Sequence, residues 1–476
     1  MPTTQTASSA TRTTSLLRSS ITREHGFEPL RVEGELPAEL TGTLYRNGPG
    51  LYETFGRPYT HMFEGDGAIS AIRIAPGEVT GAHRVVAGPE YCEEQRRGKS
   101  LFGLNAPWWR RMSANIFNRA KNTANTSVMT WQGRLFALME AAKPIEISQE
   151  DLQTGSETDL GVIPGTFSAH PHRVHARNTL YNFGLRYGRQ TFLDLFELPD
   201  RGPARLLHSI PLKFPVMLHD FIATEKHLVF LISPAKIRVI RALTSLPPFE
   251  KLFRWDPREG TEVIVVPIDA PTKLRRFHTE AFFQFHFANA FESGDELVVD
   301  FIRYQDLKIL TRLGADGPTP TMAEGADSAF VRARINPQTT SFCPEVRGQL
   351  CEFPQIHPSR AGRSYKYAWM VEQSTQPQGS DPDADQLVCL DVDTGHTRRY
   401  KLEGERRTSE PVFVPRSASG QEDDGHLLSL IYDPVCQASH IAVFDSQRFE
   451  DGPQARLWFD HHVPTTFHGV WVPSST

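Results

Sequence analysis

Short apolar segments, each bounded by Gly, Asp or Pro, recur along almost the whole chain and restrict its fold more than any other feature. Clear examples lie at residues 133–139, 179–184, 227–232, 296–301, 366–371, 386–390, 426–432 and 441–444. Two of them run into a turn that contains Asp391 or Asp445 before the next strand. Strand, turn and strand at roughly blade-sized spacing are typical of an all-β protein of the β-propeller class. The repeats are too degenerate for the blades to be counted from the pattern.

The distribution of residues predicts one large domain. A chain of 476 residues could hold two or three domains, but no Ser/Gly-rich or charged linker interrupts its middle. We therefore expect residues 26–476 to form a single β-propeller domain. Residues 1–25 are expected to be a disordered tail, because residues 1–23 are rich in Ser and Thr and contain no acidic side chain. A transit peptide is the alternative interpretation of the same residues.

Charge and cysteine content exclude several classes of protein. The net charge of −5 and the pI of about 6.4 offer no basic field for a nucleic acid. The five cysteines are odd in number and form no CxxC pair, which argues against a disulfide framework or a thiolate zinc site. A reducing compartment fits this pattern, so we expect a cytoplasmic protein. No segment reaches the ~18 apolar residues that a membrane span requires.

Two segments depart from the strand pattern, residues 102–117 and 237–255. Both mix apolar and cationic side chains at helical spacing, and the first places Trp108 and Trp109 beside Arg110 and Arg111. Such segments suit helices that lie on a membrane surface or roof a pocket. Ordinary amphipathic helices that cover the core are the alternative. Peripheral contact with a membrane through these two segments is therefore an expectation.

Four of the 18 histidines lie in an unusual context, flanked by aromatic or apolar residues beside a small or turn residue. They are His170, His219, His286 and His468, each at an expected strand end or loop. Their wide separation suits ligands that different blades deliver to one axis. Four neutral imidazoles without a thiolate suit Fe, Cu, Ni or Zn. His468 lies in the apolar, proline-containing stretch 463–473, close to a C-terminus that would ordinarily fray.

Three glutamates are candidates to orient such imidazoles: Glu140, Glu352 and Glu410. Each lies among apolar residues, where a carboxylate is unfavourable unless it is paired or hydrogen-bonded. Acceptors on the far ring nitrogens fix the tautomer and orientation of metal-binding histidines. A structural ion pair with an arginine is the alternative role for each of the three.

Eight stretches in order carry a resemblance to a known family. They are GTLYRNGPG at 42–50, HMFEGDG at 61–67, AHP at 169–171, HDF at 219–221, FHFANA at 285–290, EFP at 352–354, SEPVFVP at 409–415 and FHG at 467–469. Each is weak alone, but together they resemble the carotenoid cleavage oxygenases over about residues 42–473. That family includes apocarotenoid oxygenases, the retinal-pigment-epithelium isomerase and stilbene-cleaving dioxygenases.

The resemblance implies a seven-bladed propeller capped by a dome of loops and short helices, with Fe(2+) on the axis. It implies that His170, His219, His286 and His468 bind the iron and that Glu140, Glu352 and Glu410 orient them. Many relatives have a second histidine after the third ligand, where this chain has Phe287. The implied reaction is cleavage of a carbon–carbon double bond by dioxygen, with a hydrophobic polyene as substrate and two carbonyl products.

Two positions favour a carotenoid or apocarotenoid over a stilbene. Stilbene-cleaving members typically hold a phenol with a Lys just before the first glutamate and with a Tyr after a Leu-Phe-Gly stretch. This chain has Met139 and Leu104 there. A buried phenol without partners is unfavourable by about 1–3 kcal/mol. Stilbene cleavage, isomerisation without cleavage and a non-catalytic propeller scaffold are the alternatives.

Overall fold

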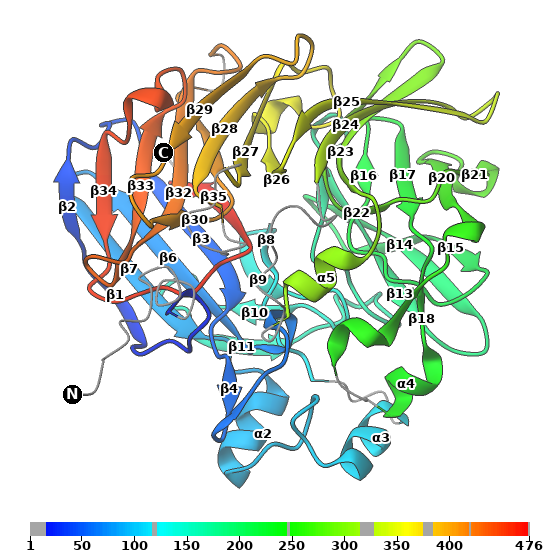
Figure 1. The fold of residues 1–476 in the computed structure, drawn as a ribbon, viewed down its shortest axis with the longest axis horizontal. Helices are drawn as coiled ribbons and strands as arrows, with labels where there is room; N and C mark the ends of the chain where they lie inside the picture. Colours follow the sequence, from blue (N-terminus) through cyan, green and yellow to red (C-terminus); the bar gives the residue numbers. More distant parts are fainter. Residues whose placement is uncertain are drawn as a thin grey trace, which may run out of the picture.

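The computed structural model describes residues 16–116, 121–244, 248–314, 328–374, 384–417 and 420–474. Within these ranges the chain forms seven antiparallel sheets of four to six strands and two small two-stranded sheets. The seven sheets follow one another around a centre (Figure 1). The prediction of an all-β, seven-bladed propeller is confirmed.

Five sheets are built from strands consecutive in the chain apart from insertions. The second has β8 (Ser127–Trp131), β9 (Arg134–Leu138), β10 (Ile145–Ile147) and β11 (Thr154–Glu157); the third has β12 (His172–Val174), β13 (Thr179–Arg186), β14 (Thr191–Pro199) and β15 (Arg205–Leu212). The fourth has β16 (Ile222–Ala223), β17 (His227–Ile232), β20 (Thr261–Pro267) and β21 (Arg275–Thr279). The fifth has β22 (Phe283–Ser293), β23 (Glu296–Tyr304), β24 (Ala329–Asn336) and β25 (Ser341–Gln349); the sixth has β26 (Cys351–Gln355), β27 (Tyr367–Glu372), β28 (Gln386–Asp391) and β29 (Thr397–Lys401).

The first and seventh sheets combine strands from both ends of the chain. The first contains β1 (His25–Pro29), β7 (Glu78–Val85), β6 (Gly67–Ala75), β3 (Gly42–Pro49) and β35 (His468–Pro473). The seventh contains β2 (Arg31–Gly34), β34 (Ala455–Trp458), β33 (Ala438–Asp445), β32 (Gly425–Asp433), β30 (Arg407–Thr408) and β31 (Val412–Pro415). The C-terminal strand thus pairs with the N-terminal blade, and an N-terminal strand pairs with the last blade, which closes the ring.

The core is distributed between neighbouring blades because most of these strands are apolar on both faces. All nine residues of β32 are buried, and Leu428 and Leu430 pack with Ile441 and Val443 of β33. Comparable clusters join the other blades. Strands buried on both faces read as nearly continuous apolar runs, and this explains why the recurring segments were visible in the sequence.

Four insertions between strands form a cap on the propeller. They contain β4 (Glu53–Thr54), β5 (Arg57–Pro58) and the 3-10 turn Met62–Glu64; α2 (Pro89–Arg97) and α3 (Trp108–Ile116); β18 (Ala235–Ile237), α4 (Val239–Thr244), the 3-10 turn Phe249–Leu252 and β19 (Phe253–Trp255); and α5 (Lys308–Arg312). In Figure 1, α2, α3 and α4 lie together along the lower edge. The insertions also contact one another: the rings of His61 and Phe249 lie 4.6 Å apart between centroids, and His61 Nε2 lies 3.0 Å from the carbonyl oxygen of Leu310.

The two segments expected to be helical are so only in part. Residues 102–107 form turns before α3, and residue 117 lies outside the described residues. Residues 237–255 contain one short helix, a 3-10 turn and strand β19, which pairs with β18. The helix α4 covers only Val239–Thr244, and Pro248, which precedes the 3-10 turn, has no backbone N–H with which to continue a helix. The preceding Pro247 lies outside the described residues.

The expected tail does not extend to residue 25. Residues 16–23, which we call the N-terminal strap, contact the propeller, and β1 begins at His25. Leu17 is buried and its carbonyl accepts a hydrogen bond from the backbone of Thr465, while Ser19 Oγ lies 3.0 Å from His462 Nε2. The Ser- and Thr-rich composition did not indicate that the N-terminal strap is ordered, because its contacts are mainly hydrogen bonds. Residues 1–15 lie outside the described residues.

Candidate metal centre

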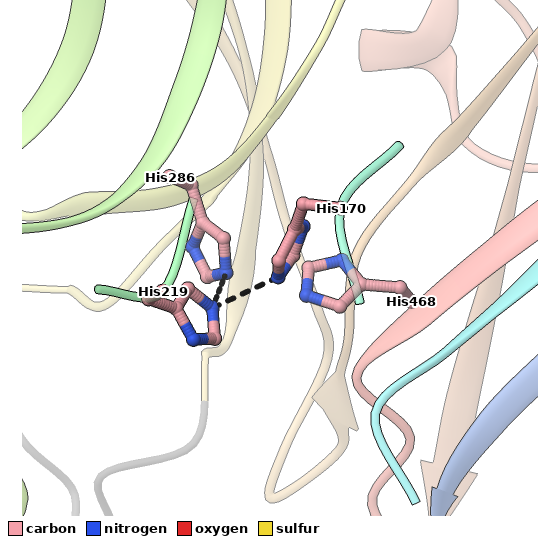
Figure 2. A group of neighbouring side chains, drawn as sticks. All are labelled: His170, His219, His286 and His468. Carbon is pink, nitrogen blue, oxygen red and sulfur yellow. Dashed lines mark hydrogen bonds between the residues drawn. The ribbon is translucent and has the colours of Figure 1, made fainter. Parts of the chain in front are cut away.

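Four histidines from four blades meet at the centre of the propeller (Figure 2). His170 and His219 lie just before β12 and β16, His286 lies within β22, and His468 is the first residue of β35. One ring nitrogen from each can be chosen so that all four lie within 4.8 Å of one another. The structure therefore brings together all four histidines that the sequence predicted, although no two are near each other in the chain.

Each predicted glutamate lies against one of three histidines. Glu140 Oε1 is 2.5 Å from His219 Nδ1, Glu352 Oε2 is 2.6 Å from His286 Nδ1, and Glu410 Oε1 is 2.8 Å from His468 Nδ1. These are the contacts expected of groups that fix a tautomer, because a carboxylate accepts the proton of Nδ1 and leaves Nε2 with its lone pair.

The resulting arrangement of lone pairs fits a cation. His219 Nε2 lies 2.9 Å from His170 Nε2 and 3.1 Å from His286 Nε2. With Nδ1 of His286 donating to Glu352 and Nδ1 of His219 facing Glu140, protons on both Nδ1 atoms would leave the two Nε2 atoms facing each other without a proton between them. Such an approach is repulsive unless a positive charge lies among the nitrogens. The donor set thus suits a borderline divalent metal of the Fe, Cu, Ni or Zn type.

Local backbone irregularities aim two of these side chains. The pairing of β22 with β23 shifts register between Gln284 and Phe287, so His286 lies in a bulge. β26 shifts register between Glu352 and Gln355, and Phe353 between them has φ = 54°. Bulges often re-aim a side chain beside a functional site, and a positive φ in an aromatic residue is strained. The Phe353 ring stacks on His286 at 5.1 Å between centroids.

The glutamates are held differently. Glu352 Oε1 accepts a hydrogen bond from the Tyr304 hydroxyl at 2.6 Å. Glu410 accepts from Gln355 Nε2 and from the backbone of Gly469, both at 2.8 Å, and the guanidinium of Arg46 lies 4.0 Å away. These hydrogen bonds stabilise the ionised form of each acid. Glu352 and Glu410 are therefore fixed against their histidines by different sets of hydrogen-bond donors.

Burial and pairing oppose each other in the pKa values of the centre. Burial raises the pKa of Glu140, Glu352 and Glu410, but the paired imidazoles outweigh it and leave each pKa below its ordinary value. Burial and the neighbouring rings hold the pKa of His170 well below its usual range. The carboxyls are thus anionic and His170 is neutral at physiological pH, as metal binding requires.

Two cavities meet at the cluster. The first, of about 170 Å³, touches His219, His286 and His468 and has largely apolar walls. We call it the apolar cavity; among its lining residues are Met62, Phe63, Phe285, Ile309, Leu313 and Phe467. The second, of about 280 Å³, touches His170, His286 and His468 and is lined by residues of the innermost strands. We call it the axial cavity. The histidines thus separate an apolar space under the cap from a more polar one along the axis.

Sequence reasoning missed four residues of the centre: Arg46, Tyr304, Phe353 and Gln355. Arg46 and Phe353 lie within stretches noted as motifs, but neither was given a role. Tyr304 lies outside the motifs, at the end of β23, and reaches Glu352 only through the packing of the fifth blade against the sixth. A lone arginine inside an apolar strand, as at Arg46, was the one available signal.

Comparison with known proteins gives a family assignment. The model of the family described as retinal pigment epithelial membrane protein (RPE65) matches residues 19–473. An apocarotenoid-15,15'-oxygenase of Synechocystis is 32% identical over 462 residues, which cover 93% of this chain and 92% of that protein. An isoeugenol monooxygenase of Pseudomonas putida is 27% identical, with 93% and 94% covered.

A solved structure agrees in fold. The cobalt-substituted apocarotenoid oxygenase (ACO) of Synechocystis matches with a TM-score of 0.86 at 29% identity, covering 97% of this chain and 99% of that one. The chain belongs to the RPE65 family, that of the carotenoid cleavage oxygenases. It is thus a metal-dependent oxygenase by family, and its four-histidine cluster is suited to the metal.

Proposed function

We propose that this protein binds Fe(2+) through His170, His219, His286 and His468 and cleaves a double bond of a carotenoid or apocarotenoid with dioxygen. The observation that carries the proposal is the arrangement of the cluster: four imidazoles converge, three of them held by carboxylates, beside an apolar cavity. The similarity to the apocarotenoid-15,15'-oxygenase supports the same activity.

The chain's own residues would bind and orient the substrate. Bound iron supplies the dioxygen chemistry that side chains lack. Phe63, Phe285 and Phe467 line the apolar cavity beside the histidines and exclude water from it. An extended polyene gains about 25 cal/mol per Å² of apolar surface that it buries there. Such binding would place one double bond beside the metal, as proximity and orientation require.

Residue 139 supports a polyene rather than a phenol as substrate. Met139 accepts hydrogen bonds at its sulfur from the backbone N–H and the hydroxyl of Thr123, each at 3.3 Å. No cation is therefore available at the position where stilbene-cleaving members typically have lysine. A phenolic substrate is the competing candidate, because one relative of this chain is an isoeugenol monooxygenase.

The test of substrate class is a panel of carotenoids, apocarotenals, hydroxystilbenes and isoeugenol offered to the iron-loaded protein. We expect carbonyl products from apocarotenals, with oxygen consumed in proportion. Products from the phenolic compounds alone would contradict the substrate proposal. An isomerised substrate without oxygen uptake would contradict cleavage.

The metal assignment is tested by replacing single histidines. His468→Ala should lower the iron content of the purified protein from about one per chain to nearly none, because it removes a ligand, while the far-ultraviolet circular dichroism stays unchanged. His426→Ala is the matched control: His426 is also buried against a carboxylate, 3.2 Å from Glu39, but lies outside the cluster. Full iron content in His468→Ala would remove this residue from the ligand set.

We also propose that the protein is cytoplasmic and that α3 and α4 contact a membrane surface. The two helices pack against each other and expose Trp108, Trp109, Val239, Ile240 and Leu243, with Ile240 81% exposed. Arg110 and Arg238 stand beside them. Aromatic and apolar side chains with adjacent cations suit the interface of a bilayer. None of the described helices is long and apolar enough to cross a membrane.

Vesicle binding tests this contact. Ile240→Glu should abolish co-sedimentation with anionic vesicles, because a charge replaces the most exposed apolar side chain of the pair of helices. Val435→Glu is the control, since Val435 is 86% exposed on a turn of the seventh blade, away from both helices. Equal vesicle binding by both variants would contradict a role for α3 and α4.

A further inference from the structure

We propose that the axial cavity is the passage by which a hydrated divalent metal ion reaches the four histidines of the folded protein. This inference rests on the proposed metal function and concerns a different question, namely how the ion arrives. The axial cavity touches His170, His286 and His468 directly. An ion inside it therefore needs to cross no layer of protein before it meets the first imidazoles.

The walls of the axial cavity carry carboxylates. Asp220 and Glu410 both line it and both are buried. Asp220 accepts hydrogen bonds from the backbone of Phe221 at 2.8 Å and of Phe287 at 3.0 Å, and its Oδ1 lies 2.8 Å from His172 Nε2. Fixed anions along a narrow polar space raise the local concentration of cations. They also replace part of the hydration of an ion that must shed its water to bind.

The passage would open on the side of the third blade, where two lining residues of the axial cavity are partly exposed. Arg173 lines the cavity, its side chain is 33% exposed, and it pairs with Asp200. His172, its neighbour on β12, is 23% exposed and contacts Asp220. On this route an ion would pass Arg173, His172 and Asp220 before it reaches the histidines. A cation at the mouth is repelled by Arg173 and attracted by the carboxylate behind it.

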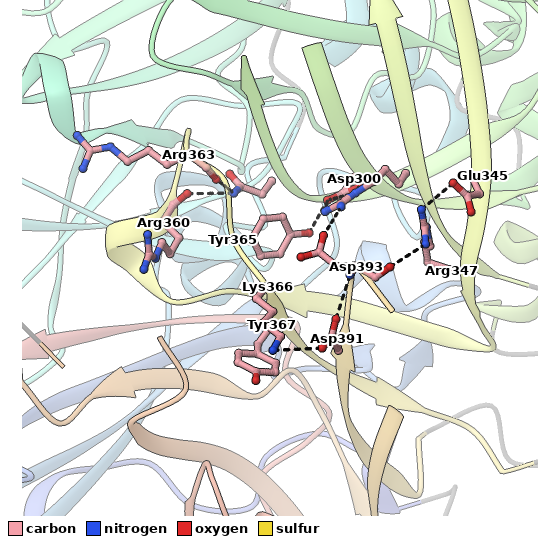
Figure 3. Close-up of polar contacts among 12 residues, drawn as sticks. Asp300, Glu345, Arg347, Arg360, Arg363, Tyr365, Lys366, Tyr367, Asp391 and Asp393 are labelled. Atoms are coloured by element: carbon pink, nitrogen blue, oxygen red, sulfur yellow. Dashed lines mark hydrogen bonds and ion pairs between the residues drawn. The ribbon is translucent and has the colours of Figure 1, made fainter. Parts of the chain in front are cut away.

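The opposite wall is a fixed loop rather than a moving lid. Ala361 and Gly362 line the axial cavity. Asn289 Nδ2 donates to the carbonyls of Arg360 and Arg363 at 3.0 and 2.9 Å. Tyr365 donates to Asp300 at 2.7 Å (Figure 3). Because both ends of the loop are anchored, a larger side chain at residue 361 would extend into the cavity instead of displacing the loop.

The apolar cavity offers a poor alternative. Glu140 and Glu352 line it near the histidines, but Phe63, Ile309 and Leu313 are also on its walls, and an ion that passes such side chains loses hydration without replacement. The polyene and the metal ion would therefore approach the same cluster from opposite sides. Each side has the polarity that its ligand requires.

The experiment measures how fast metal-free protein, prepared with a chelator, takes up Co²⁺, followed by the visible absorption of the bound ion. We expect Ala361→Phe to slow the uptake about tenfold, while the amount bound at equilibrium stays at one ion per chain. Ala384→Phe is the matched control, because Ala384 lines the apolar cavity. Its uptake rate should equal that of the unaltered protein.

A second variant tests the charge at the mouth. Arg173→Gln should speed Co²⁺ uptake severalfold at low ionic strength and less at high ionic strength, because it removes a repulsive charge that salt would otherwise screen. This result is independent of whether Ala361→Phe folds.

Three results would overturn the passage. The first is that Ala384→Phe slows Co²⁺ uptake while Ala361→Phe leaves it unchanged. The second is that neither substitution changes the uptake rate. The third is that the chelated protein regains no metal under native conditions, although the protein as isolated contains it. In each case the metal function survives. If no divalent metal binds by any route, the proposed function fails instead.

Discussion

Arg46 links the segment that carries His468 to the segment that carries Glu410. Its side chain is 1% exposed, and its guanidinium donates to Thr466 Oγ1 and to the backbone carbonyls of Glu410 and Phe467 at 2.8, 2.8 and 3.3 Å. Burial lowers the pKa of Arg46 to about 10, so the side chain remains charged at neutral pH. One positive charge therefore lies beside the buried carboxylate of Glu410, and it holds the two segments that carry Glu410 and His468 in register.

Replacing Arg46 should affect stability and metal binding together. Arg46→Met should lower the free energy of unfolding by roughly 3–5 kcal/mol, because it leaves the buried carbonyls of Glu410 and Phe467 without this donor and removes the positive charge beside the Glu410 carboxylate. Urea denaturation of the metal-free protein measures the loss, and a Co²⁺ titration should show weaker binding.

Two controls belong with that measurement. Arg73→Met removes an arginine that is half-buried and stacks on Phe27, outside the centre, and should leave Co²⁺ binding unchanged. Unaltered Co²⁺ affinity in Arg46→Met would show that Arg46 contributes only to folding.

At the scale of elements, the N-terminal strap supports the segment that leads to His468. Leu17 and Ser19 of the strap contact Thr465 and His462, and Ser20 Oγ accepts a hydrogen bond from the backbone of Tyr52. Residues 459–467 connect β34 to β35 and would otherwise have one side uncovered. The strap thus links the start of the chain to the final ligand.

A charged side chain in the N-terminal strap should destabilise the segment 459–467 that leads to His468. Leu17→Asp buries a carboxyl where an apolar side chain packs, and should cost about 2–5 kcal/mol of unfolding free energy. Thermal unfolding and Co²⁺ affinity measure the change, and both should fall. Leu206→Asp places the same substitution at a leucine that is 44% exposed on β15 and should be nearly neutral. Equal behaviour of the two variants would mean that the strap is dispensable.

At the scale of the whole molecule, the ring closes at a second group of histidines. His83 Nδ1 of β7 lies 3.1 Å from His461 Nε2, and the ring of His25 lies 5.2 Å from that of His461. Around this group stand Asp460, Arg23 and Glu28, together with His462, which contacts the strap. Burial, followed by the charges of the neighbouring histidines, holds the pKa of His83 well below its usual range.

Because of this second group of histidines, we expect the folded protein to lose stability in acid. The pKa of His83 in the folded protein lies below the unfolded value near 6.5, so the unfolded chain binds more protons as the pH falls. Stability from this residue is complete above about pH 6.5 and is lost below it, by at most about 1.4 kcal/mol per pH unit for one proton. Urea denaturation at pH 7.5, 6.0 and 5.0 measures the slope.

His83→Gln should reduce that slope, because it removes the buried titrating group. His396→Gln, at an exposed histidine in the turn between β28 and β29, should leave the slope unchanged. Equal slopes for all three proteins would assign the acid sensitivity to other residues.

The sequence alone determined the fold class and the members of the centre. Apolar strands buried on both faces leave a visible pattern, and histidines or glutamates in apolar surroundings are rare enough to stand out, as at His286 and Glu410. Tertiary structure decided what those residues contact. Arg46 and Tyr304 reach the glutamates from other blades, and strap order depends on hydrogen bonds to residues more than 400 positions away, as from Ser19 to His462. Local sequence determines the chemistry of each residue and the element that it forms. The contacts between residues across the propeller axis form only when all seven blades have closed into a ring.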